Sequence, residues 1–212
     1  HSVQLPAFVG RNGELRWIIE NARGIKAMND GGWAYGSGIA GNRYPLDPAV
    51  KPVEPQAWLG VTIQPLTSYY YDRCGNYMTH GGAQRDRRAW EALIPKEKAV
   101  EMVTFRDRFA PDAPYLFLNG FQGGRYNSMD VNAILRYADR GSIWLISQTE
   151  QLGHYFRNSL HIGHGYRDDY FSMAGTIRLD ASLDAADAGM TVTTLPRFNG
   201  ADWTRSIIWD RG

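Results

Sequence analysis

The chain has 212 residues, 43% hydrophobic and 21% charged, which is the composition of an ordinary folded protein rather than a disordered one. The formal net charge is +1 and the basic residues form no block, so nothing favours a nucleic-acid partner. The single cysteine, Cys74, excludes an internal disulfide and a cysteine-based metal cluster, and no apolar run reaches the roughly 18 residues of a transmembrane helix.

The first predicted element is an amphipathic helix over residues 13–28. Its apolar residues recur at helical spacing, and Asn12 can cap its start. Glycine, proline and asparagine then predominate over residues 29–55, which predicts an irregular, ordered segment or linker. We therefore expect an N-terminal helical and irregular segment over 1–56, followed by a β-sandwich domain over 57–212.

The rest of the chain is dominated by strand patterns. Residues 57–66 predict a strand, residues 86–92 a short helix, and Pro95 the first position of a one- or two-turn helix. Short apolar runs separated by turn residues are typical of a sandwich, so we predict a mainly β, antiparallel fold. The further predicted strands cover 102–106, 115–119, 133–138, 143–147, 158–162, 171–181, 190–196 and 204–209.

The most informative stretch is 115–147, YLFLNGFQGGRYNSMDVNAILRYADRGSIWLIS. An apolar strand leads into a glycine-rich loop and then into a hairpin, for which Asp139-Arg140-Gly141 predicts a three-residue turn with Gly141 left-handed. Functional side chains are often held on loops between rigid strands. The loop over 123–130 carries the polar residues Arg125, Tyr126, Asn127, Ser128 and Asp130.

The last predicted strand, 204–209, ends at the turn-forming sequence Asp210-Arg211-Gly212. A hairpin without its second strand would leave this strand as an edge. We therefore expect the chain to be part of a longer protein.

Four segments, in this order and spacing, resemble the heparinase II/III-like polysaccharide lyases: WLGVTIQPLTSYYY, KAVEMVTFRDRFAPDAPYLFLNG, HYFRNSL and NGADWTRSIIWDRG. The resemblance extends from roughly Trp58 to Gly212. It implies a β-sandwich that the family joins to an α/α toroid, and cleavage of uronic-acid glycosides by β-elimination. It also implies an acidic polysaccharide or oligosaccharide as partner, a secreted or periplasmic location, and the missing toroid domain as a further partner.

The family's glycine-rich loop usually supplies a His-x-His-x-Asp run, in which one His assists catalysis and another binds zinc. The same register here reads Tyr126-Asn127-Ser128-Met129-Asp130, so neither His position holds a histidine. Asp130 and Asn132 match the family pattern. The resemblance therefore places Tyr126 at the catalytic position and removes one metal ligand.

Other metal positions implied by the resemblance are also changed. Ser147 stands where an Asp is expected, and Arg157 stands beside Asn158 where a His is expected. We therefore expect no family-type zinc site and no cofactor. A weak alternative metal cluster is formed by His154, His161 and His164, whose spacing is not typical of zinc.

The candidate catalytic residues are Tyr126, Arg125 and Asn127. Tyr126 could carry a proton if Arg125 favoured its phenolate, while Arg125 and Asn127 could mask a substrate carboxylate. Alternatively, Tyr126 stacks on a neighbour or a sugar, Arg125 forms an exposed salt bridge, and Asp130 holds the loop through backbone hydrogen bonds. The candidate substrate-binding residues are Asp130, Asn132, Arg157 and Asn158.

Whether the chain is an enzyme stays open at this point. The first reading is a heparinase II/III-like lyase or a diverged remnant of one. The second is a non-catalytic glycan-binding or scaffolding sandwich, and the third is a structural domain for its own toroid. Aromatic residues make up 13% of the chain, and tyrosine and tryptophan suit sugar rings, although β-sandwiches also use aromatics in their strands.

Overall fold

The computed structural model describes residues 11–14, 16–17, 48–77, 92–110, 112–121, 131–146, 176–196 and 202–212. The chain divides into two compact units, residues 1–57 and residues 58–212. The described strands all belong to the second unit, which also carries Asn132, the described candidate site residue.

In the first unit, residues 13–14 and 16–17 are helical, where the sequence predicts the start of a helix. The amide of Arg16 donates to the carbonyl of Asn12 at 3.0 Å, and its guanidinium donates to the carbonyl of Val50 at 2.7 Å. The amide of Val53 donates to the carbonyl of Gly13 at 2.9 Å. The rest of the predicted helix and most of the irregular segment lie outside the described residues.

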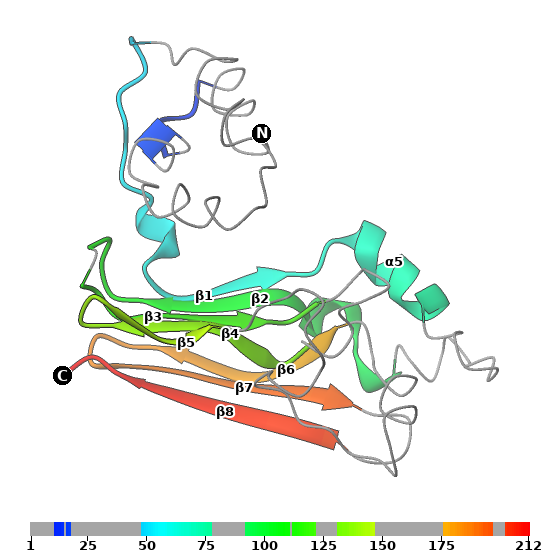
Figure 1. The fold of residues 1–212 in the computed structure, drawn as a ribbon. Helices are drawn as coiled ribbons and strands as arrows, with labels where there is room; N and C mark the ends of the chain where they lie inside the picture. Colours follow the sequence, from blue (N-terminus) through cyan, green and yellow to red (C-terminus); the bar gives the residue numbers. More distant parts are fainter. Residues whose placement is uncertain are drawn as a thin grey trace. The chain divides into compact units, whose positions relative to one another are not determined.

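The second unit is mainly β and antiparallel, as the sequence predicts (Figure 1). The described residues include the short helices η1 (Gln56–Trp58), which spans the boundary between the units, α5 (Ser68–Tyr77) and η2 (Lys96–Lys98). The strands are β1 (Gly60–Pro65), β2 (Ala99–Arg106), β3 (Tyr115–Asn119), β4 (Ala133–Asp139), β5 (Ser142–Ile146), β6 (Ile177–Asp184), β7 (Ala188–Pro196) and β8 (Asp202–Asp210).

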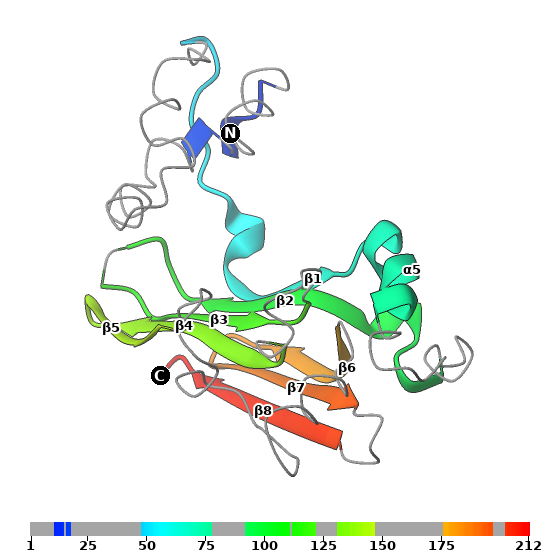
Figure 2. The same ribbon diagram turned by 45° about the vertical axis from the view of Figure 1, so that its right-hand side comes forward.

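All eight strands form one curled sheet in the order β5-β4-β3-β2-β6-β7-β8, with β1 paired to β2. The sheet has two leaves, β1 to β5 and β6 to β8, which Figure 2 shows facing each other. The leaves are hydrogen-bonded where Ala99 pairs with Arg178 and Val100 with Ile177. The sandwich-like arrangement is therefore one continuous sheet folded back on itself. Among the described strands, β8 lies at one end of the strand order and β5 at the other.

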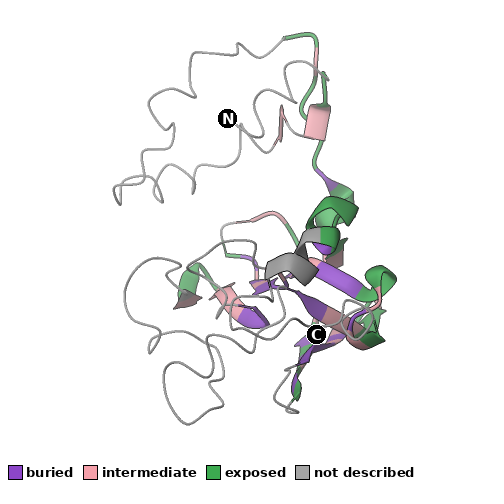
Figure 3. Cartoon of the chain, turned by 90° about the vertical axis from the view of Figure 1, so that its right-hand side faces the viewer, coloured by how far each residue is buried: buried purple, intermediate pink, exposed green. Residues whose placement is uncertain are grey.

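Aromatic packing between the leaves forms the core. The ring of Phe105 on β2 stacks on Trp209 of β8 with centroids 5.5 Å apart, and Tyr137 of β4 meets Trp209 edge-on at 6.3 Å. A Cβ on Gly189 would lie 2.6 Å from the Cγ2 atom of Val61, so glycine lets β7 approach β1 closely. Figure 3 shows the buried residues along the strands; those with no exposed surface include Val103, Phe105, Leu118, Ile177 and Leu195.

The hairpin between β4 and β5 differs from the predicted three-residue turn. Asp139 pairs with Ser142, so the loop consists of Arg140 and Gly141 alone. Both residues are left-handed, with φ of 51° and 73°, as in the type I′ turns that suit two-residue hairpins. The amide of Arg140 donates to the carbonyl of Asp112 at 3.1 Å, which helps to hold this conformation.

The helices depart most from the sequence predictions. Pro95 precedes η2 in an extended conformation (φ −57°, ψ 143°) rather than occupying its first turn, and Ala99 and Val100 already belong to β2. Helix α5 was not predicted. The amides of Tyr70 and Tyr71 donate to the carbonyl of Thr67 at 3.1 and 2.9 Å and thereby close its first turn.

Strand predictions agree more closely. Strand β3 has the predicted bounds, while β7 and β8 extend two residues or fewer beyond theirs at each end. Strand β6 starts at Ile177, and residues 171–175 of the strand predicted there lie outside the described residues. The predicted strand 158–162 and most of the predicted helix 86–92 also lie outside them.

We predict that Trp209→Ala lowers the free energy of unfolding by about 3–5 kcal/mol, because it removes the ring between Phe105 and Tyr137 and leaves a cavity. The adjacent Ile208 is 78% exposed, so Ile208→Ala is expected to change it by less than about 0.5 kcal/mol. Guanidinium chloride denaturation of both variants measures the difference. Equal losses would show that the leaves are not joined through Trp209.

Candidate functional site

One end of the sheet receives the chain segments that carry the predicted site residues. The glycine-rich loop departs after β3 and returns to β4, where Asn119 pairs with Ala133. The segment over 147–175 leaves β5 and re-enters at Thr176 before β6, at the same end of these antiparallel strands. We call this the loop-bearing end; it is the end at which α5 lies in Figure 1.

Most predicted site residues lie outside the described residues, so their roles stay predictions. This is true of Arg125, Tyr126, Asn127 and Asp130 in the glycine-rich loop, and of Arg157, Asn158, His154, His161 and His164 in the following segment. Topology connects both segments to the loop-bearing end. Asn132 is the one predicted site residue that the structure describes.

Asn132 is fully buried just after the glycine-rich loop and is left-handed, with φ of 64°. Its side-chain amide donates to the carbonyl of Trp203 at 3.1 Å, and its Oδ1 accepts from the hydroxyl of Thr193 at 2.8 Å. Its main-chain amide donates to the carbonyl of Asn119 at 2.8 Å, and its carbonyl accepts from Nε of Arg205 at 2.8 Å.

These contacts tie the end of the loop to β3, β7 and β8 at once. The polar groups of Asn132 are engaged within the protein, as burial requires. Asparagine is also one of the few residues other than glycine that adopts a left-handed conformation readily. The geometry gives Asn132 a structural role at the base of the loop, and its contact with a substrate stays a prediction.

The start of the loop is fixed in the same way. The amide of Gly120 donates to the carbonyl of Glu101 at 2.9 Å, and its carbonyl accepts from the amide of Ile177 at 2.8 Å. Phe121 forms an isolated bridge with Thr176, whose buried hydroxyl donates to the carbonyl of Val100 at 2.8 Å. Two strands of the first leaf and one of the second therefore hold the point from which the loop departs.

Three aromatic side chains gather beside this point, and we call them the aromatic cluster: Tyr69, Tyr70 and Phe121. Tyr69 is 58% exposed and Tyr70 39% exposed, and their rings meet edge-to-face with centroids 5.2 Å apart. The ring of Tyr70 lies 5.1 Å from that of Phe121. The sequence showed the tyrosines, but no local pattern placed them beside Phe121.

The aromatic cluster stands on a fixed helix. Tyr71, the next residue of α5, is 4% exposed and its hydroxyl donates to the carbonyl of Ile94 at 2.7 Å. The side of α5 that carries Tyr71 therefore faces the core, while Tyr69 and Tyr70 are exposed. Lys96 is an exposed residue, and its Nζ atom lies 5.9 Å from the centre of the Tyr71 ring.

A polar cluster on the second leaf includes Asp180. Its Oδ1 accepts from Nε of Arg178 at 2.6 Å, and its Oδ2 accepts from the hydroxyl of Thr194 at 2.5 Å. Burial opposes ionisation of Asp180, but these hydrogen bonds and the charges of Arg178 and Lys98 outweigh it and hold the pKa of the carboxyl below its ordinary value. Arg178 also donates to the carbonyl of Leu93 at 2.9 Å, so the cluster links β6 to the segment before η2.

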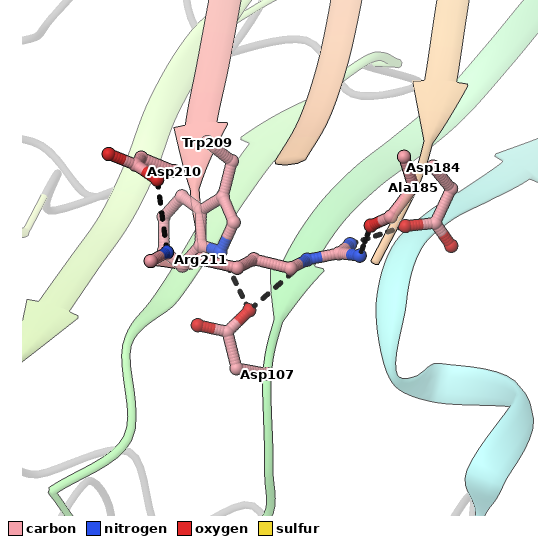
Figure 4. A network of polar contacts seen from close by, with 7 residues as sticks. Asp107, Asp184, Ala185, Trp209, Asp210 and Arg211 are labelled. Atoms are coloured by element: carbon pink, nitrogen blue, oxygen red, sulfur yellow. Dashed lines mark hydrogen bonds and ion pairs between the residues drawn. The ribbon is translucent and has the colours of Figure 1, made fainter. Parts of the chain in front are cut away.

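The opposite end of the sheet holds a network of charges that neutralise one another (Figure 4). Arg211 reaches Asp184 and the carbonyl of Ala185 on one side, and its Nε lies 3.6 Å from Oδ1 of Asp107 on the other. The same Asp107 oxygen accepts from the indole of Trp209 at 2.8 Å. These groups fix the last residues of the chain to β6 and to the residue after β2, which is a structural task.

Among the residues described, no three His, Cys, Asp or Glu side chains are grouped so that they could hold a metal ion. The described helices include none with the length and apolar character needed to cross a membrane. No protein-family model, curated protein or solved structure matches the chain.

We predict that Asn132→Gly destabilises the fold by about 1–3 kcal/mol, because the buried hydroxyl of Thr193 and carbonyl of Trp203 lose their partner. Asn132→Ala is expected to cost about 1–2 kcal/mol more, since alanine resists the left-handed conformation. Arg140→Gly is the control, because Arg140 is also left-handed but exposed, and it is expected to cost less than about 1 kcal/mol. If denaturation curves show that Asn132→Ala is more stable than Asn132→Gly, the structural role assigned to the left-handed Asn132 is contradicted.

The pKa shift of Asp180 predicts a dependence of stability on acid. Because the folded pKa is below the unfolded value of about 3.9, ionised Asp180 stabilises the fold above that value, and the contribution is lost as pH falls through the folded pKa. Asp180→Asn is therefore expected to lower the melting temperature at pH 7 but progressively less below about pH 4. The exposed Asp187, changed to Asn, is the control, and melting curves between neutral and acidic pH test whether the gap closes.

Proposed function

We propose that the protein binds an acidic glycan at the loop-bearing end and cleaves it by β-elimination, as a diverged relative of the heparinase II/III-like polysaccharide lyases. The observation that carries the proposal is the fixed base of the glycine-rich loop. Its flanking residues Phe121 and Asn132 are held by hydrogen bonds to several strands. A loop on such a base can present side chains in a constant geometry, which acid–base chemistry requires.

In the proposed reaction, the proton on the carbon beside the uronate carboxylate is removed, the bond to the leaving oxygen breaks, and a carbon–carbon double bond forms. Arg125 and Asn127 mask the carboxylate, because the carbon is a weak acid until that charge is neutralised. Tyr126 takes the proton and returns one to the leaving oxygen. Asp130, Arg157 and Asn158 contact the sugar in this proposal, and no metal or other cofactor takes part.

A non-catalytic glycan-binding domain is the second candidate. The exposed aromatic cluster favours it, since aromatic faces can hold sugar rings without any acid–base group. Both candidates place the glycan at the loop-bearing end, and they differ in whether a bond is broken. A secreted or periplasmic location would suit either of them.

The lyase proposal predicts that uronic-acid polysaccharides gain ultraviolet absorbance from an unsaturated product, with or without a chelator. Tyr126→Phe is expected to lower kcat by about 10²-fold to 10⁴-fold, the usual contribution of a positioned acid or base. Arg125→Ala is expected to lower kcat/KM, and a panel of alginate, polygalacturonate, hyaluronan, chondroitin sulfate and heparin covers the main uronic-acid chemistries.

The control for Tyr126→Phe is Tyr137→Phe, which keeps the ring against Trp209 and lies outside the loop. It should cleave like the unchanged protein. A panel that gives no absorbance change, while the protein still binds a glycan, would replace the lyase by the non-catalytic domain. Activity that survives Tyr126→Phe would remove Tyr126 from its proposed role.

A further inference from the structure

The aromatic cluster is exposed although its helix has a buried side. Tyr71 fills that side and its hydroxyl donates to the carbonyl of Ile94, whereas Tyr69 and Tyr70 are exposed. Single exposed aromatics are common on protein surfaces. Here two exposed rings and a third, half-buried ring touch in series, which makes a continuous aromatic surface.

The backbone that carries the three rings is anchored to the rest of the unit. Tyr71 fixes α5 to the carbonyl of Ile94, and the main chain at Phe121 is bridged to Thr176. The rings of Tyr69 and Tyr70 stand at 74° to each other. An anchored backbone beneath the rings reduces the conformational entropy that is lost when a ligand binds.

The surroundings indicate which ligand fits. A pyranose ring has an apolar C–H face that can lie on an aromatic ring and hydroxyl groups that can bond to a phenol. Phe121 stands immediately before the glycine-rich loop, so a ligand on the cluster lies beside that loop's base.

We infer that Tyr69, Tyr70 and Phe121 form a stacking subsite for pyranose rings of an acidic glycan, beside the point at Phe121 from which the glycine-rich loop departs. The inference rests on the proposed function, because it assigns an additional subsite to the same glycan. It does not depend on catalysis.

The test is isothermal titration calorimetry with oligosaccharides of the five polysaccharides named above. The double variant Tyr69→Ala/Tyr70→Ala is expected to bind about tenfold more weakly, whereas Tyr69→Phe/Tyr70→Phe, which keeps both rings, is expected to lose much less. Melting curves confirm that each variant is folded.

The matched control is Trp144→Ala, because Trp144 is 67% exposed but lies in the β4–β5 hairpin at the opposite end of the sheet. It should bind like the unchanged protein. Unchanged affinity in the double alanine variant, with affinity lost in Arg125→Ala, would overturn the subsite and leave the proposed function standing. Weakened binding in the double variant with full activity in Tyr126→Phe and Arg125→Ala would support the subsite and remove the proposed catalytic loop. Absence of binding to every oligosaccharide would overturn both.

Discussion

The stacking of Phe105 on Trp209 is the contact on which the folded sheet depends. Its two leaves are joined in the hydrogen-bond ladder where β2 meets β6, at two residue pairs. Such a short junction allows the sheet to fold back, but it cannot by itself hold the leaves together. The aromatic contact between β2 and β8 does so far from the junction, and the indole of Trp209 is in turn bonded to Asp107.

The same folding positions the base of the glycine-rich loop. Asn132 follows the loop on the first leaf, yet its side chain is bonded to Thr193 and Trp203 of the second leaf. If the leaves separated, Asn132 would lose both partners and its left-handed backbone would lose its support. Core packing and loop geometry are therefore coupled: the contact between the leaves also fixes the place where the proposed site stands.

The sequence predicted most of the described strands because the apolar and turn residues that indicate a strand lie next to one another in the chain. In β3 the apolar residues Tyr115 to Leu118 and the glycine-rich sequence that begins at Gly120 predict the bounds of the strand from its own neighbourhood in the chain. Helix α5 has no such local signal, since its first turn is made of tyrosines and depends on the distant carbonyl of Ile94. The aromatic cluster was missed for the same reason: the contact between Tyr70 and Phe121 exists only after folding. For Asn132, sequence resemblance identified the position, but its burial and partners come from β7 and β8.

The two ends of the sheet differ in how their charges are used. At the end opposite the loops, Arg211 forms ion pairs with Asp107 and Asp184, so these charges neutralise one another. At the loop-bearing end, the described polar groups serve mainly to hold backbone in place, as Asn132 and Thr176 do. The described part of the sheet thus fixes the position of the loop ends, and the aromatic cluster lies beside the point from which the loop departs. The proposed acid–base groups belong to the loop and the proposed stacking surface does not, so the proposal separates cleavage from binding: changes confined to the loop are expected to abolish cleavage and to leave the aromatic cluster in place.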